Sequence, residues 1–215
     1  MEVVCIKKLI SIVISAIIIA LTPFVAIRYR DIHLSGKFCA AFFKKDIDTV
    51  NDLINKNWNV NTYSNLGLIP FPEFNARYLP LNQACMFSNS DVVEKLLKRG
   101  ADPNKKGTYD NPAYCAVQGA RPNGFPDTKI KIELLINYGM DLSLAKVRYQ
   151  PVSELLHELS FKISEKDKEI AVEILKIMLD NGAVYDVEDL RRALIKADMA
   201  WAFEYLMEGR TPTNG

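Results

Sequence analysis

The sequence has few of the residues on which most catalytic and metal sites depend. Its 215 residues include only two histidines, four cysteines and no Cys-x-x-Cys pair. Neither His33 nor His157 has a cysteine or another ligand nearby at metal-binding spacing, and no P-loop, GxGxxG, GxSxG or HExxH motif occurs. The sequence therefore predicts no cofactor, no metal and no enzymatic activity.

The chain also lacks an excess of charge of either sign. Lysines and arginines number 27 and acidic residues 26, which gives a formal net charge of +1. Because nucleic-acid binding depends on a cationic surplus, we expect no nucleic-acid partner. The cysteines are too widely spaced for a disulfide framework, and we expect Cys39, Cys85 and Cys115 to be small buried apolar residues.

The sequence does contain one long apolar run at its N-terminus. Residues 9–27 read LISIVISAIIIALTPFVAI without a charged residue, between Lys7–Lys8 and Arg28–Arg30. Nineteen helical residues at about 1.5 Å each nearly span the ~30 Å hydrocarbon core of a bilayer. A buried helix of a soluble domain would normally be amphipathic. Residues 1–32 are therefore predicted to be an N-terminal membrane anchor or signal segment.

An uncleaved anchor and a cleaved signal peptide remain alternatives for this segment. Cleavage after Ala26 or Ala20 would place Phe24 or Ile18 at the third-last position, where small residues are preferred. This favours an uncleaved, single-pass anchor. Two basic residues flank each end, so the positive-inside rule is nearly balanced. The very short N-terminal tail suits a bacterial inner-membrane protein whose remaining residues are periplasmic.

The rest of the chain repeats one amphipathic pattern. In DVVEKLLKRG, the apolar residues Val92, Val93, Leu96 and Leu97 share one helical face before Gly100 ends the helix. Related segments end at Gly139, Gly182 and Gly209, and in the first one Asn57 is expected to take the left-handed place of the glycine. Shorter helices precede several of these segments, with a proline at the first position in LPLNQAC, NPAYCAV and QPVSELL. Such a period predicts a solenoid of helix pairs.

The best-preserved unit resembles an ankyrin repeat. Residues 79–85, LPLNQAC, are similar to the Thr-Pro-Leu-His-x-Ala-Ala opening of that family, and VVEKLL followed by GADPN is similar to its second helix and turn. The resemblance implies an all-α ankyrin-repeat solenoid over residues 33–210, with a disordered tail at 211–215. We expect about four to five units, near residues 36–61, 79–104, 111–143, 150–186 and 187–209, with insertions at 62–78, 120–128 and 162–167.

The insertions and inter-repeat fingers contain the candidate binding residues. The insertion 61–79 is apolar, so it either covers the first two repeats or contacts a partner. The extended loops between repeats are called fingers here. The fingers 105–111 and 145–150 each contain a tyrosine with basic neighbours, and tyrosine and arginine are common interface residues. Ankyrin proteins use fingers and first helices for recognition, so the resemblance implies these partner-binding candidates: Phe71, Phe74, Arg77, Tyr78, Lys105, Lys106, Tyr109, Arg121, Phe125, Lys146, Arg148 and Tyr149.

The sequence as a whole predicts a membrane-anchored protein-binding module. Such a module would act by noncovalent occlusion or scaffolding. By analogy with small bacterial envelope proteins, it could be an immunity protein that neutralises a secreted toxin or phospholipase effector. The alternatives are a general envelope scaffold or chaperone-like partner of another enzyme, a host-directed or eukaryotic membrane ankyrin protein, and an enzyme of unrecognised class.

Overall fold

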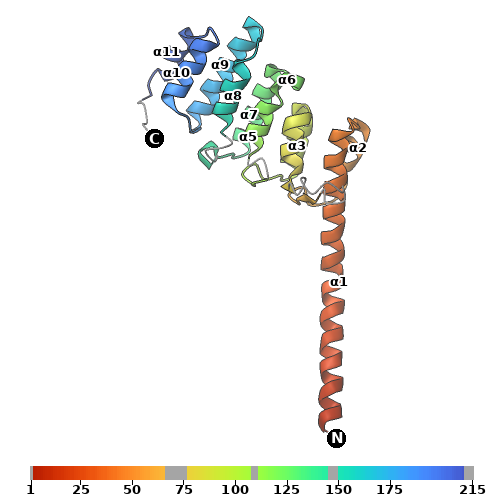
Figure 1. Cartoon of the computed structure of the whole chain (residues 1–215). Coiled ribbons are helices and arrows are strands. Elements are labelled where there is room, and N and C mark those ends of the chain that lie inside the picture. The colour runs from red at the N-terminus through yellow and green to blue at the C-terminus, as the bar shows by residue number, and fades with distance from the viewer. Residues whose placement is uncertain (1, 66–76, 108–110, 145–149, 211–215) are drawn as a thin grey trace.

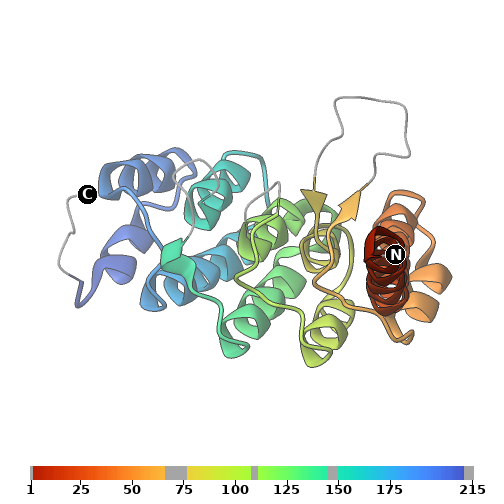
Figure 2. The ribbon, with the colours of Figure 1, turned by 90° about the horizontal axis from the view of Figure 1, so that it is seen from below.

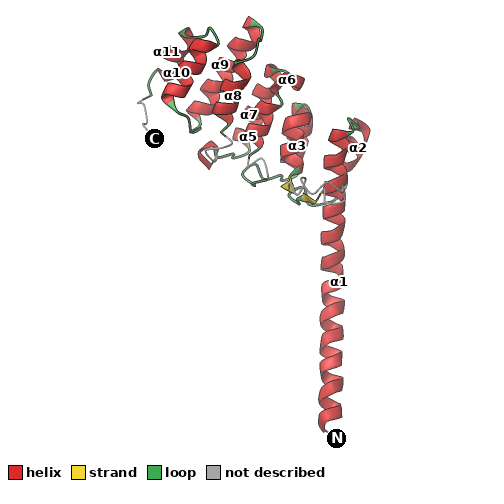
Figure 3. Ribbon diagram, in the orientation of Figure 1, coloured by secondary structure: helices red, strands yellow, loops and turns green. Residues whose placement is uncertain are grey.

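The computed structural model describes residues 2–65, 77–107, 111–144 and 150–210. These residues are almost entirely helical (Figure 3). The exception is an antiparallel pair of two-residue strands, β1 (Ser64–Asn65) and β2 (Arg77–Tyr78). The helices are α1 (Glu2–Phe43), α2 (Ile47–Ile54), α3 (Pro80–Phe87), α4 (Ser90–Lys98), α5 (Pro112–Gln118), α6 (Ala120–Asn123), α7 (Phe125–Asn137), the 3-10 turn η2 (Leu142–Leu144), α8 (Pro151–Leu159), α9 (Glu165–Asp180), α10 (Val187–Lys196) and α11 (Trp201–Met207).

The helices pair along the chain and stack into two rows (Figures 1 and 2). The inner row contains the end of α1 followed by α3, α5, α8 and α10, and the outer row contains α2, α4, α7, α9 and α11. Each helix packs mainly on its own partner and on helices of the adjacent pair, so one continuous apolar core runs through the array. This is the all-α solenoid that the repeating pattern predicts, with three inner helices beginning at proline as expected.

Glycine turns end the outer helices where the sequence predicts them. Gly100 has φ +83°, and its conformation lets the Ala101 N–H donate to the Leu96 carbonyl oxygen at 3.0 Å. This contact satisfies a carbonyl group at the helix end that would otherwise lack a partner. The other predicted turn glycines also have positive φ, at Gly139, Gly182 and Gly209.

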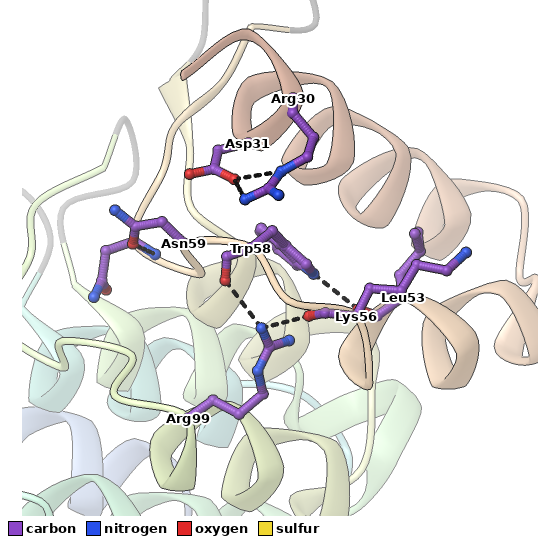
Figure 4. A network of polar contacts seen from close by, with 8 residues as sticks. Arg30, Asp31, Leu53, Lys56, Trp58, Asn59 and Arg99 are labelled. Atoms are coloured by element: carbon purple, nitrogen blue, oxygen red, sulfur yellow. Dashed lines mark hydrogen bonds and ion pairs between the residues drawn. The ribbon is translucent and has the colours of Figure 1, made fainter. Parts of the chain in front are cut away.

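The prediction that Asn57 takes a left-handed conformation is wrong. Within the described residues, the non-glycine residues with positive φ are Lys45 and Asp198. The end of α2 is capped by a residue far away in the sequence. The Arg99 guanidinium donates to the Ile54 carbonyl oxygen at 2.5 Å and to the Lys56 carbonyl oxygen at 2.7 Å, the second contact being drawn in Figure 4. With these carbonyls satisfied by a side chain, the turn needs no left-handed residue.

Two asparagines connect the turns of successive helix pairs. The Asn61 amide donates to the Gly100 carbonyl oxygen at 2.7 Å and accepts from the Asp102 N–H at 2.8 Å. Asn104 repeats both contacts one pair later, with the Gly139 carbonyl oxygen and the Asp141 N–H, each at 2.8 Å. These bonds fix the spacing of the first three turns, so the adjacent fingers are held in register.

The core contains three cysteines and one lysine. Cys39, Cys85 and Cys115 are free and buried, which confirms the sequence prediction for them. Lys131 on α7 is also fully buried, and its Nζ lies 2.7 Å from Asp127 Oδ2 and donates to the Cys85 carbonyl oxygen at 3.1 Å.

Helix α1 is continuous from the apolar N-terminal run into the repeat array. One helix in the described part of the chain, within Val13–Phe43, is long and apolar enough to cross a membrane, with a mean hydropathy of 1.6. Residues 13–30 are exposed, and burial begins at Asp31, which is 7% exposed. The domain boundary predicted between residues 32 and 33 therefore falls inside a helix, and the described structure has no linker there.

Candidate partner-binding surface

Half of the predicted binding residues lie outside the described residues. These are Phe71, Phe74, Tyr109, Lys146, Arg148 and Tyr149. For Arg77 the structure describes the backbone, which belongs to β2. The role of these seven residues in partner binding stays a prediction.

Two of the predicted binding residues are buried in the array. Phe125, at the start of α7, is 4% exposed and belongs to the core, where the insertion 120–128 folds into α6 and the first turn of α7. Tyr78 is 5% exposed, and its ring lies 6.1 Å from the ring of Phe43. Both side chains stabilise the fold and offer little surface to a partner in this conformation.

The basic finger residues Lys105 and Lys106 are held by Asn61 and Tyr63 of the preceding finger. Lys105 Nζ donates to the Asn61 carbonyl oxygen at 2.5 Å and lies 4.8 Å from the centroid of the Tyr63 ring. The Tyr63 hydroxyl donates to the Lys106 carbonyl oxygen at 2.8 Å, which leaves the Lys106 side chain exposed. This finger is therefore an ordered basic surface.

Arg121 lies at the opposite end of the helix pairs, on α6 (Figure 1). Its guanidinium pairs with both carboxylate oxygens of Glu158, which is 3% exposed. It also stacks 3.6 Å above the centroid of the Phe161 ring, and Phe161 packs edge-to-face with His157 at 5.2 Å. The predicted binding residue Arg121 thus joins a partly exposed cluster of cationic and aromatic side chains.

This cluster borders a groove between the inner helices α8 and α10. The groove encloses about 390 Å³, which falls within the usual range of ligand and peptide sites. Its walls are Ser153, Leu156, His157 and the C-cap residue Ser160 from α8, and Asp189, Arg192, Ala193 and Lys196 from α10. Most of these side chains are polar and exposed, so the groove can offer hydrogen bonds and positive charge to a partner.

Charges in the groove are only partly paired with one another. Arg192 lies 2.6 Å from Asp189 Oδ1, whereas no ion pair of Lys196 is found among the described residues. Beside the groove, burial raises the pKa of Glu154, although a hydrogen bond from Tyr114 and the nearby His157 oppose this shift. The groove therefore has a wall with two basic side chains on α10, opposite a mostly polar wall on α8.

Glu154, His157 and Glu158 bring three potential metal-ligand atoms within 4.8 Å of one another. Both oxygens of Glu158, however, accept from the Arg121 guanidinium. A cation bound there would lie beside a positive charge and would have to displace a buried ion pair. The donor set therefore fits an ion-paired cluster better than a metal site.

A second hollow lies between the outer helices α2 and α4, away from the groove. It encloses about 420 Å³ and is bordered by Ile47, Phe87 and Val92 among other residues. Phe87 is 41% exposed and lies 5.5 Å from Phe43, which is 53% exposed. The lining of this hollow is more polar than that of the groove, and its border includes Asn89, Asp91 and Lys95.

Sequence reasoning did not name His157, Arg192 or Lys196 as partner-binding residues. The pattern that could have identified them is their spacing in the sequence. Ser153, His157 and the C-cap residue Ser160 are exposed on one face of α8, and Asp189, Arg192 and Lys196 are exposed in the same way on α10. Such faces become a groove only when the two helices lie side by side. Finding them would have required marking the exposed face of every first helix.

Comparison with known families supports the ankyrin assignment over one unit. A family model described as an ankyrin repeat matches residues 77–105, which contain β2, α3, α4 and the following turn. Ankyrin repeats are typically non-catalytic and bind other proteins, so the match supports a protein-protein interaction module. A search of curated proteins finds no match to the chain.

Proposed function

We propose that the protein is a membrane-anchored ankyrin-repeat module that binds another protein and catalyses no reaction. Its five described helix pairs are five repeat units, of which the pair α3–α4 matches the family and the others are degenerate. Residues 9–27 cross the membrane once. The two lysines before the apolar run would favour a cytoplasmic N-terminus and, in a bacterium, a periplasmic repeat array.

The observation that carries this proposal is the exposed groove on the inner row. In ankyrin-repeat arrays the inner helices and fingers together form the concave side, and here the strands β1 and β2 lie on the side of the inner row (Figure 2). The groove presents His157, Arg192 and Lys196 on helices that the core holds rigidly. A preformed surface loses little conformational entropy on binding, which favours tight protein recognition.

The finer proposal concerns the partner. Because α1 joins the array without a linker, the groove keeps a fixed position relative to the bilayer, on the side where a membrane-attacking enzyme would act. We therefore favour an immunity protein that occludes a toxin or phospholipase effector. A general envelope scaffold or chaperone-like partner of another enzyme is the second candidate, and a host-directed membrane ankyrin protein is the third.

Variant-dependent capture tests the binding surface. A photo-crosslinker at Ser153 in the full-length protein should trap a partner from membranes of the source organism. The double variant His157→Ala, Arg192→Ala should lose most of that product. The matched control Lys166→Ala, Glu169→Ala, on exposed positions of α9, should retain it. Equal capture by both variants would show that the groove does not bind the partner.

Two further observations separate the partner classes. A toxin or lipase gene beside this one, together with protection of cells that express that toxin, would favour immunity, whereas several weaker crosslinked products would favour a scaffold. Hydrolase turnover by the purified protein that disappears in His157→Ala would overturn the non-catalytic proposal.

A further inference from the structure

The finger layer of the array faces the same side as the membrane helix. In Figure 1 the strands β1 and β2 and the turn after α4 lie at the lower end of the helix pairs, from which the N-terminal part of α1 extends. Figure 2 looks along α1 from this side, and the finger loops are the part of the array nearest the viewer. A membrane around residues 9–27 would therefore lie beneath the fingers.

The height of this layer above the membrane follows from helix geometry. The Ser35 hydroxyl donates to the Thr62 carbonyl oxygen at 2.7 Å, which ties the segment before β1 to α1 at that level. Ser35 lies eight residues after Ile27, the end of the apolar run, so the two are about 12 Å apart along the helix. Lipid headgroups occupy about 5–8 Å of that distance. The remaining gap is shorter than the Debye length of about 8 Å at physiological ionic strength.

A series of hydrogen bonds fixes the finger of Lys105 and Lys106 relative to α1. Thr62, bonded to Ser35, precedes Tyr63, whose hydroxyl donates to the Lys106 carbonyl oxygen at 2.8 Å. Lys105 Nζ is bonded to the Asn61 carbonyl oxygen in the same segment. The backbone of Lys106 is therefore held at a fixed place in the finger layer, and its exposed side chain extends from there.

The described charges on this side of the molecule are mixed: four basic side chains lie here with the exposed carboxylates Asp102 and Asp141, and Asp141 borders the same hollow as Lys106. Arg28 and Arg30 follow the apolar run, and Lys105 and Lys106 lie on the finger. Asp31 is 7% exposed and pairs with Arg30 at 3.1 Å, which hides most of its charge from the membrane side. Asp102 is the exposed carboxylate of this finger, and one of its oxygens accepts from the Asn104 N–H.

We propose that this basic surface, formed by Arg28, Arg30, Lys105 and Lys106, contacts the anionic phospholipid headgroups around the membrane helix. The inference rests on the proposed insertion of residues 9–27. A basic residue beside an anionic leaflet raises the population of the contact about fivefold. Headgroup contact at the finger holds the array against rotation about α1, so the groove opens along the membrane surface.

Lysine acetylation on the full-length protein in lipid nanodiscs tests the contact. An uncharged N-hydroxysuccinimide ester is applied in phosphatidylcholine discs and in discs that also contain phosphatidylglycerol, and each lysine is quantified by mass spectrometry. Lys106 should react at least about threefold more slowly in the anionic discs, because headgroup phosphates shield its amine. Lys166, exposed on α9, is the internal control and should react equally in both. High salt should abolish the difference.

Charge reversal provides the matched variants. Lys106→Glu should restore the acetylation rate of Lys105 in anionic discs to its rate in neutral discs, and Lys166→Glu should leave the slow rate unchanged. A Lys106 rate that does not depend on phosphatidylglycerol, in a protein that co-elutes with discs and resists carbonate extraction, overturns the lipid contact and leaves the anchor intact. A protein that carbonate extracts overturns the anchor and the contact together.

Discussion

The Arg99 guanidinium makes two contacts with Trp58. It donates to the Trp58 carbonyl oxygen at 2.9 Å, and it lies 5.5 Å from the centroid of the Trp58 indole ring (Figure 4). Trp58 is 4% exposed, and its indole N–H donates to the Leu53 carbonyl oxygen at 2.8 Å. One side chain from the second helix pair thus orders the end of the first, which otherwise lacks the glycine turn of its neighbours.

Replacing Arg99 with lysine should therefore destabilise the protein by about 2 kcal/mol. An ammonium group cannot reproduce the planar fork that reaches three carbonyl oxygens, and each charge-assisted bond contributes about 1.5–3 kcal/mol. Urea unfolding of the full chain in detergent measures the loss. The neighbouring variant Lys98→Gln, which removes an exposed pair with Glu94, should cost less than about 0.5 kcal/mol. Equal losses would contradict a capping role for Arg99.

The buried pair of Lys131 and Asp127 predicts a non-additive response. Asp127 Oδ1 also accepts from the Ser90 N–H at 2.8 Å, so the pair connects α7 to the end of α3 and the start of α4. Lys131→Met leaves a carboxylate without its cation and should cost about 3–5 kcal/mol. Adding Asp127→Asn should recover part of that loss in a double-mutant cycle.

Lys129→Met provides the control for this cycle. Lys129 pairs with Glu173 at 2.6 Å on the surface, so its removal should cost less than about 1 kcal/mol. If the losses at Lys131 and Asp127 add independently, the two charges do not act as a pair.

The buried cysteines should resist alkylation while the array is folded. Burial raises the pKa of Cys85 to about 12 and that of Cys115 well above its ordinary value, so almost no reactive thiolate forms at neutral pH. In a Cys5→Ser background, maleimide should label neither residue until urea unfolds the chain. Labelling that is fast in native conditions would mean that the α3–α5 contact opens locally.

Glu154 predicts a pH effect of opposite sign to that of a salt-bridged carboxylate. Because burial raises its pKa in the folded state, the unfolded chain loses this proton first, and its contribution to stability falls as the pH rises from its ordinary range through the raised value. The Glu154→Gln variant does not have this pH-dependent loss of stability. The difference in unfolding free energy between the variant and the native protein should therefore shift in favour of the variant as the pH rises from about 4 to 7. Thermal unfolding followed by circular dichroism measures this difference.

Glu169→Gln, at an exposed position of α9, should show a nearly constant difference over the same range. A Glu154→Gln difference that decreases with rising pH would reverse the inferred sign.

Local patterns in the sequence were enough to predict most of the array. Helix faces, first-position prolines and Gly100-type turns depend on residues within a few positions of one another, and these predictions are confirmed. The end of α2 was predicted wrongly because its cap, Arg99, lies more than forty residues away in the chain. No local rule connects Asn57 to that guanidinium.

The binding surface was harder to predict for the same physical reason. The finger lysines Lys105 and Lys106 follow directly from the repeat turn, and both are exposed at least in part. The groove needs α8 and α10 side by side, and Phe125 changes from a predicted contact to a core residue because the insertion around it is helical. Tertiary packing decides which face of a helix remains open.

If residues 9–27 cross the membrane as proposed, the continuous helix α1 makes the array sensitive to bilayer thickness. A transmembrane helix that is long for its membrane relieves hydrophobic mismatch by tilting. No hinge separates residues 9–27 from the helix that packs in the array, so the same tilt is passed to every helix pair. Membranes of different thickness would then present the groove at different angles, and the lipid composition of the membrane would select which partners can reach it.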